Sequence, residues 1–163
     1  MSKDFLWAPW RMDYISKSDK EQNVFIKKAE SENDRENLVL YRAKKNFVIM
    51  NLYPYNNGHL MFVPYDKHDD MTNLDIEILH DIMKLAQESM RILKTKLKSE
   101  GFNFGLNMGK AAGAGIDDHL HFHVVPRWSG DSNFMPIIGH TKIIMQSLFD
   151  TYDILKPAFD LLK

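Results

Sequence analysis

At its most distinctive point the chain reads His119-Leu120-His121-Phe122-His123-Val124-Val125. Side chains two residues apart share one face of a β-strand, so this alternation predicts a strand from His119 to Val125 with imidazoles on one face and apolar groups on the other. Three histidines are costly as core packing, because each buried imidazole needs hydrogen-bond partners. The stretch therefore indicates a functional site.

Two chemistries could use such a face. Neutral imidazole, with an ordinary pKa of about 6.5, is a good nucleophile toward phosphorus, and protonated neighbours could hold phosphate oxygens. His-x-His pairs on strands are also typical metal ligands, and Asp117 or Asp118 could complete such a site. The motif alone leaves both chemistries open.

The preceding loop reads Gly109-Lys110-Ala111-Ala112-Gly113-Ala114-Gly115. Glycine and alanine let the backbone approach a ligand closely and turn N–H groups inward, which is how anions are often held. A flexible hairpin connection would have a similar composition. Beside three histidines, the loop favours the phosphate interpretation.

Farther upstream, three segments rich in β-branched and aromatic residues predict strands: Leu38–Arg42, Phe47–Asn51 and His59–Val63, which Pro64 ends. The polar stretch Ser31–Asn37 predicts a loop before them. One long helix follows, because apolar residues recur at three- and four-residue steps: Leu79, Ile82, Met83, Ala86, Met90, Leu93 and Leu97. Thr72 and Asp75 have the spacing of a capping box at its start, and Gly101 is expected to terminate it.

Two further elements complete the order. Alternating apolar residues predict a strand over 102–108, before the Gly-rich loop. A last helix is expected to begin near Thr141, with Ile144, Leu148, Tyr152 and Leu155 on one face and Pro157 breaking it. Short connections between strands favour antiparallel pairing, so the predicted fold class is α+β.

The composition excludes several classes of protein. The chain has 163 residues, 44% hydrophobic and 26% charged, as in one soluble domain. Its 21 Lys and Arg nearly balance 22 Asp and Glu, so no global field favours nucleic acid or a membrane. Without cysteine there is no disulfide, thiolate zinc site or cysteine nucleophile. The N-terminus has charges and a proline where a signal peptide needs an apolar run, so we expect a cytoplasmic protein.

The seven-residue stretch fits the histidine triad signature, His-φ-His-φ-His-φ-φ with φ apolar, at every position. The strand pair Phe47–Asn51 and Gly58–Pro64, and then Asn107-Met108-Gly109, follow in the order of that family. The resemblance covers roughly Asn37 to Trp128. Two flanking segments, Leu6–Ile15 and Val125–Phe134, are similar to a bacterial branch that includes diadenosine tetraphosphate phosphorylases, near the fragile histidine triad dinucleoside polyphosphate hydrolases.

The resemblance implies a HIT-like fold: a five-stranded antiparallel sheet with one long helix and a C-terminal helical tail, paired by a two-fold into a homodimer. Residues 1–163 then form a single domain, with an N-terminal arm and helix over 1–36, a core over 37–128 and a tail over 129–163. Trp7, Trp10 and Trp128 are expected in the core or at a dimer contact.

The resemblance also implies residue roles. His121 resembles the nucleophile, His119 and His123 the flanking histidines that contact phosphate or leaving-group oxygens, and His59 a fourth histidine that supports the nucleophile's orientation. The implied nucleotide-binding residues are Asn51 at the ribose, Ile49 in the base pocket, and Asn107, Gly113, Ala114 and Gly115 at phosphate. The remaining histidines, His68, His80 and His140, match no catalytic position, and His80 is expected to be solvated.

The sequence departs from the family at two places. Many relatives carry a Cys-x-x-Cys zinc site where this chain has Asn23–Ile26, so we expect no tightly bound metal and at most magnesium as a counter-ion of the substrate. His68 is near the place where such sites take a histidine. The loop segment Gly113-Ala114-Gly115-Ile116 lacks the Gln with Ser or Thr of other branches, which leaves the leaving-group preference open.

The resemblance thus implies cleavage of a dinucleoside polyphosphate, such as diadenosine tetraphosphate, at the α-phosphorus. A nucleotidyl-His121 intermediate would form and be resolved by phosphate or water. The alternatives are a nucleoside phosphoramidase of the same family, a nucleotide-binding protein without turnover, and a metallohydrolase that uses the triad as ligands.

Overall fold

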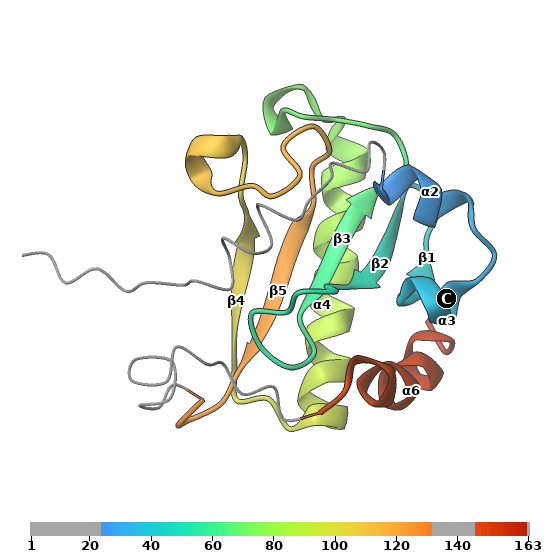
Figure 1. The fold of residues 1–163 in the computed structure, drawn as a ribbon, viewed down its shortest axis with the longest axis vertical. Helices are drawn as coiled ribbons and strands as arrows, with labels where there is room; N and C mark the ends of the chain where they lie inside the picture. Colours follow the sequence, from blue (N-terminus) through green and yellow to red (C-terminus); the bar gives the residue numbers. More distant parts are fainter. Residues whose placement is uncertain (1–23, 132–145, 163) are drawn as a thin grey trace, which may run out of the picture.

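The computed structural model describes residues 24–131 and 146–162, and Figure 1 shows their arrangement. Five antiparallel strands form one sheet in the order β1-β2-β3-β5-β4. The strands are β1 (Val39–Arg42), β2 (Asn46–Met50), β3 (Leu60–Pro64), β4 (Gly101–Leu106) and β5 (Phe122–Arg127). The predicted α+β class and the five-stranded antiparallel sheet are confirmed.

Helices cover the sheet unequally. The described helices are α2 (Val24–Glu30), α3 (Asp34–Asn37), α4 (Ile76–Leu97) and α6 (Leu148–Phe159), with 3-10 turns η1 (Met71–Asn73) and η2 (Lys110–Ala112). In Figure 1 the long helix α4 runs behind the strands, along one face of the sheet. It packs against β2, β3 and β5. Within the part of the chain that is described, no helix is long and apolar enough to cross a membrane.

The core lies between α4 and the sheet. All residues of β2 and β3 are buried. From α4, Ile82, Ala86 and Leu93 of the predicted apolar stripe are buried, whereas Met83 is 54% exposed. The apolar stripe of α4 is therefore wider than the face that the sheet covers, and Met83 lies outside the core.

Both ends of α4 differ from the prediction. Asp75 is the N-cap and accepts a hydrogen bond from the Glu77 N–H, while Thr72 belongs to η1, which Asp70 caps. The predicted Thr72–Asp75 capping box is therefore wrong, because each acidic residue caps its own turn. The helix ends at Leu97, its C-cap Lys98 adopts a left-handed φ of 56°, and Gly101 instead begins β4.

The segment predicted as a loop over 31–37 contains the short helix α3. Arg42 fixes this region to β1: its guanidinium donates to the carbonyls of Lys28, Ala29 and Ser31 and pairs with Asp34. These carbonyls are at the C-terminal end of α2, where a helix has unpaired acceptors. Arg42 thus anchors α2 to the sheet, a contact that local sequence pattern does not reveal.

The C-terminal helix also differs from its prediction. It begins at Leu148, where Ser147 accepts a hydrogen bond from the Asp150 N–H, and Pro157 lies inside it rather than breaking it. The predicted start at Thr141, along with Ile144, Trp7, Trp10 and His140, lies outside the described residues. Trp128 is half-buried, and its Nε1–H donates to the Leu97 carbonyl at the end of α4.

The predicted strand at the histidine motif begins later than expected. β5 starts at Phe122, because the Leu120 N–H donates to the His68 carbonyl instead of joining the ladder with β3. Only His123 of the three histidines therefore lies on the strand itself. His119 and His121 precede it, which frees their backbone for contacts within the site.

Candidate active site

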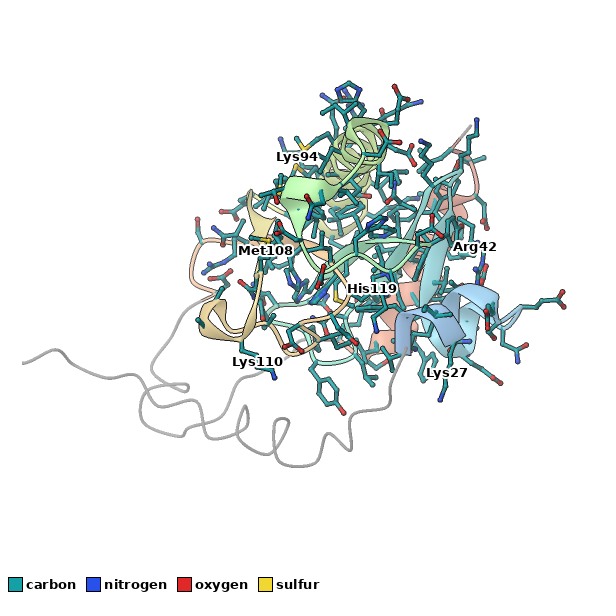
Figure 2. All side chains as sticks on the ribbon, turned by 90° about the horizontal axis from the view of Figure 1, so that it is seen from above. Lys27, Arg42, Lys94, Met108, Lys110 and His119 are labelled. Carbon is teal, nitrogen blue, oxygen red and sulfur yellow. The ribbon has the colours of Figure 1, made fainter. Side chains whose placement is uncertain are left out.

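Four of the predicted histidines lie together and are at most 7% exposed: His59, His119, His121 and His123. His123 is the centre of the group, since its ring centroid lies 4.9 Å from that of His121 and 5.0 Å from that of His59. In Figure 2, His119 lies between α2, marked by Lys27, and the loop marked by Lys110, on the side of the sheet opposite α4.

A row of residues across the sheet forms the floor beside these rings. Ile49 pairs with Met61, Met61 with His123, and His123 with Gly105. Residues directly opposite each other on antiparallel strands share a face, so all four positions face the site. The floor is therefore apolar on β2 and β3, carries an imidazole on β5 and has no side chain on β4.

The tautomer of His121 follows from one hydrogen bond. His121 Nδ1 lies 2.9 Å from the His119 carbonyl oxygen, which can only accept. The proton is therefore on Nδ1, and Nε2 keeps its lone pair. A backbone carbonyl two residues earlier thus orients the predicted nucleophile with Nε2 ready to attack.

The protons of His59 and His123 are fixed in the same way. The backbone N–H of Tyr55 donates to His59 Nδ1 at 3.0 Å, so the proton of neutral His59 is on Nε2. That Nε2–H donates to His123 Nδ1 at 2.9 Å, which places the proton of His123 on its own Nε2. His59 thus contacts His123 directly, and His123 presents a buried N–H donor that has no hydrogen-bond partner among the described residues.

His119 is held by the backbone of β3. Its Nε2–H donates to the Pro64 carbonyl at 2.9 Å, and its Nδ1 is buried without a partner in the described chain. The Nε2–H of His119 is therefore already engaged by a backbone carbonyl. In this arrangement His119 contributes chiefly its main-chain carbonyl, which orients His121.

Burial favours the neutral form of all three triad histidines. Burial lowers the pKa of His119 and of His121 below the ordinary value, and burial with the nearby His121 lowers the pKa of His123 to about 3. In the free protein these shifts disfavour the protonated neighbours expected to hold phosphate, because desolvation has the largest effect on the pKa of each ring.

The sequence prediction missed two aromatic residues of the site. Phe25 of α2 contacts His119 edge-on at 5.4 Å and His121 at 5.2 Å between ring centroids. Tyr55 covers His59 and His123 at 4.6 and 5.8 Å. Nothing local marks Phe25, because it reaches the site only through the fold of α2.

The predicted nucleotide-binding residues surround this group. Ile49 is buried in the floor, and Asn51 follows β2 with its Nδ2 3.4 Å from His59 Nδ1. The Asn51 side-chain oxygen accepts from the Tyr53 N–H. Asn107 follows β4 and is half-buried. The fold therefore brings base-pocket and ribose candidates to the same side as the histidines.

The Gly-rich loop closes on itself. The N–H groups of Ala112 and Ala114 donate to the Gly109 carbonyl, and the N–H group of Gly113 donates to the Lys110 carbonyl. Gly113 adopts a φ of 85°, which favours glycine. An anion at Gly113 or Ala114 would have to compete with these bonds, so the predicted phosphate cradle is not preformed at these N–H groups; Gly115 lies at the exposed end of the loop.

A metal site would need more ligands than the described residues bring together. Asp117 pairs with Lys110 at 3.4 Å and Asp118 with Lys67 at 2.6 Å, so neither joins the histidines as a ligand. His68 has a buried Nε2 without a partner in the described chain, and His80 is exposed as expected. In residues 24–131 and 146–162, no group of three or more His, Cys, Asp or Glu side chains could hold a metal ion.

The topology and the histidine cluster agree with the resemblance seen in the sequence. A family model described as HIT domain matches residues 32–130, more than half of the chain. The chain therefore belongs to the HIT family. The matched segment begins after α2, so Phe25 lies outside it.

Named relatives extend this result. The chain is 40% identical over 159 residues to a Mycobacterium tuberculosis protein named AP-4-A phosphorylase, covering 92% of this chain and 81% of that protein. It is 30% identical over 91 residues to a Saccharomyces cerevisiae protein named bis(5'-adenosyl)-triphosphatase, covering 55% and 44%. A solved structure described as a hypothetical histidine triad nucleotide-binding protein from Sulfolobus tokodaii shares the fold, with a TM-score of 0.65, 22% identity and coverage of 84% of this chain and 90% of that chain.

Proposed function

We propose that this chain cleaves dinucleoside polyphosphates, such as diadenosine tetraphosphate, at an α-phosphorus. The observation that carries the proposal is the fixed placement of protons. His121 Nε2 keeps a lone pair, and the neighbouring His123 Nε2 keeps a proton. The site thus combines an uncharged nucleophile with an unpaired donor. The name of the relative that is 40% identical supports this substrate class.

The reaction proceeds in two displacements. The Nε2 lone pair of His121 forms a bond to the α-phosphorus, while the bond from that phosphorus to the bridging oxygen breaks and the oxygen leaves with the electron pair. Nδ1–H stays on the ring and donates to the His119 carbonyl, which stabilises the charge that develops on the imidazole. Phosphate or water then attacks the same phosphorus, breaks the N–P bond and restores neutral His121.

The neutral state of His123 favours a polyphosphate leaving group. Giving up its only proton would leave an imidazolate, so His123 serves as a hydrogen-bond donor to the departing oxygen. A polyphosphate leaves as a stable anion, because its terminal phosphate has a pKa of only about 6. The amine of a phosphoramidate needs a proton to leave. The arrangement therefore supports dinucleoside polyphosphate cleavage over the phosphoramidase alternative.

The acceptor in this proposal is phosphate, which yields ADP and ATP from diadenosine tetraphosphate, whereas water would yield AMP and ATP. The test is to incubate the purified protein with this substrate, with and without phosphate, and to separate the nucleotides. ADP should form only when phosphate is present. Equal formation of AMP and ATP in both samples would establish hydrolysis instead, and no cleavage in either would refute the function.

Replacing the nucleophile tests the covalent route. His121→Ala should fold, because the imidazole faces the site while Phe122 faces the core, and its turnover should fall by orders of magnitude. The wild-type protein, quenched without acid, should carry an alkali-stable, acid-labile nucleotidyl group on His121. Near wild-type turnover in the variant, or an adduct on another residue, would refute the mechanism.

We further propose that two copies of the chain form a homodimer through β4 and α4. β4 is an edge strand whose backbone pairs on one side with β5. Beside it, Phe104 is 39% exposed and, with Met83 and Met90, lines a hollow of about 310 Å³. An unpaired strand edge next to an apolar hollow is a favourable surface for a second copy.

We also propose that the enzyme works in the cytoplasm without a tightly bound metal, magnesium acting only as a counter-ion of the substrate. The cysteine-free composition and the pairing of Asp117 and Asp118 with lysines support this. Metal analysis should find no stoichiometric zinc, and chelation followed by excess magnesium should restore full activity. Activity that only zinc restores would overturn the proposal.

A further inference from the structure

Gly105 lies inside β4, directly opposite His123 on β5. Because cross-strand partners share a face, a side chain at position 105 would stand beside the His123 imidazole on the site face of the sheet. The position is exposed, and a Cβ placed there would meet no atom within 4 Å. Gly105 therefore leaves open space, within one copy of the chain, beside the strand position of His123 on the site face.

Within one copy of the chain, neither the backbone nor the packing requires this glycine. The glycines with positive φ among the described residues are Gly58, Gly109, Gly113 and Gly130, and Gly105 is not one of them. Gly58 shows the contrast, since a Cβ there would lie 2.6 Å from Leu97 Cδ1. Glycine inside a strand weakens it, and it often marks a place where a ligand or another backbone comes close.

The floor of the site indicates which part of a ligand comes close. An oxygen that accepts from His123 Nε2 lies at His123, and across the sheet the group attached to it can extend over β3 or over β4. On β3 and β2 the same row is filled by the buried side chains of Met61 and Ile49. On β4 the row is empty at Gly105. The open direction for the departing group is therefore over β4.

We propose that Gly105 keeps open the path of the leaving nucleoside polyphosphate and thereby sets the size of leaving group that the site accepts. The identity of that group rests on the proposed function. A bulky residue at position 105 would obstruct a long leaving group while the attacked nucleotide still reached His121.

Gly105→Val tests this, because valine suits a strand and adds bulk only on the site face. The matched control is Gly101→Val on the same strand and face, opposite Arg127, where a Cβ lies 3.8 Å from the nearest atom. The two substrates are diadenosine tetraphosphate and adenosine 5′-phosphorofluoridate, whose leaving group is a single fluoride ion that needs no proton.

Gly105→Val should lower kcat/KM for diadenosine tetraphosphate by at least about tenfold, equivalent to about 1.4 kcal/mol, and change that for the fluoridate less than about twofold. Gly101→Val should change neither by more than about twofold. An equal loss with both substrates, or no loss with either, would refute the inference. If Gly105→Val does not fold, Gly105→Ala should show a smaller loss in the same direction.

A binding measurement separates this inference from the proposed function. In a His121→Ala background, adding Gly105→Val should weaken the affinity for diadenosine tetraphosphate and leave that for AMP unchanged, as measured by titration calorimetry. This change in affinity is expected even if the wild type cleaves neither substrate. A lack of cleavage would refute the proposed function but not the role of Gly105. Equal weakening of both ligands, with a changed molecular mass in solution, would show that Gly105 serves a contact between copies instead.

Discussion

The carbonyl of His119 and the N–H of Tyr55 each decide where a proton lies on a neighbouring imidazole. Both are main-chain groups, so their positions depend on the path of the backbone and persist when the side chains change. Substitutions at His119 should therefore cost less activity than those at His121. His123 is intermediate, because its Nε2–H contacts the leaving group without forming a covalent bond.

A second residue, Phe25, should influence how kcat/KM depends on pH. Its ring helps exclude water from His121, whose pKa burial holds below the ordinary value of about 6.5. Phe25→Ala lets water in, so the His121 pKa should rise toward that value. Because the neutral imidazole attacks, kcat/KM is lost as the pH falls through this pKa, and the acid limb of the profile should move to higher pH.

Buried Phe→Ala changes cost about 3–5 kcal/mol of stability, so a control must separate this loss from the effect on the site. Phe159→Ala, in the core contact of α6, should be similarly destabilising. It should leave the acid limb in place. The profile should be measured where circular dichroism shows each variant folded, with the His121 titration followed by NMR. An unshifted acid limb in folded Phe25→Ala would contradict the role of the ring.

At the scale of secondary-structure elements, the turn before β3 positions His59. Gly58 has a φ of 70°, and a Cβ there would lie 2.6 Å from Leu97 Cδ1 of α4. The end of a leucine side chain can rotate away, so the left-handed backbone is the larger obstacle to a side chain. This turn packs against α4 and places the next residue, His59, in the site.

Gly58→Ala should therefore lower the free energy of unfolding by about 1–3 kcal/mol. It should also reduce kcat, because His59 moves relative to His123. Urea unfolding followed by circular dichroism measures the first effect. Gly101→Ala is the control, since its φ is not positive and a Cβ there makes only an ordinary contact, so its stability should change little. Equal stability of both variants would show that the turn tolerates a side chain.

At the scale of the whole molecule, the β4 edge and the exposed part of α4 should hold two copies together. Phe104→Glu places a charge in that apolar contact, where its burial without a partner is costly. The wild type should sediment with twice the 19.1 kDa mass of the chain, and the variant as a monomer. Leu161→Glu, which is exposed beyond α6, should remain dimeric. A monomeric wild type or a dimeric Phe104→Glu would refute this surface.

The sequence by itself determined the α+β class, the strands and the long helix, and it identified the four histidines. The class and the elements follow from local periodicity, and three of the histidines follow from the unusual chemistry of three imidazoles in five residues; His59 follows from the resemblance to the HIT family. The sequence-based prediction failed at the start of β5, because the partner of the Leu120 N–H, the His68 carbonyl, comes from a distant segment. It also failed at the ends of α4, where Asp70 and Asp75 each cap their own turn and Lys98 adopts a left-handed φ.

Only the tertiary structure decided how the site holds its protons. His59 reaches His123 across 64 residues of chain, and Phe25 reaches His121 from a helix anchored by Arg42. A tautomer depends on which group lies at each ring nitrogen, and a pKa depends on how much water is excluded. Both are properties of packed neighbours. The sequence therefore determines where a histidine lies along the chain, whereas its charge and the direction of its lone pair depend on the folded structure.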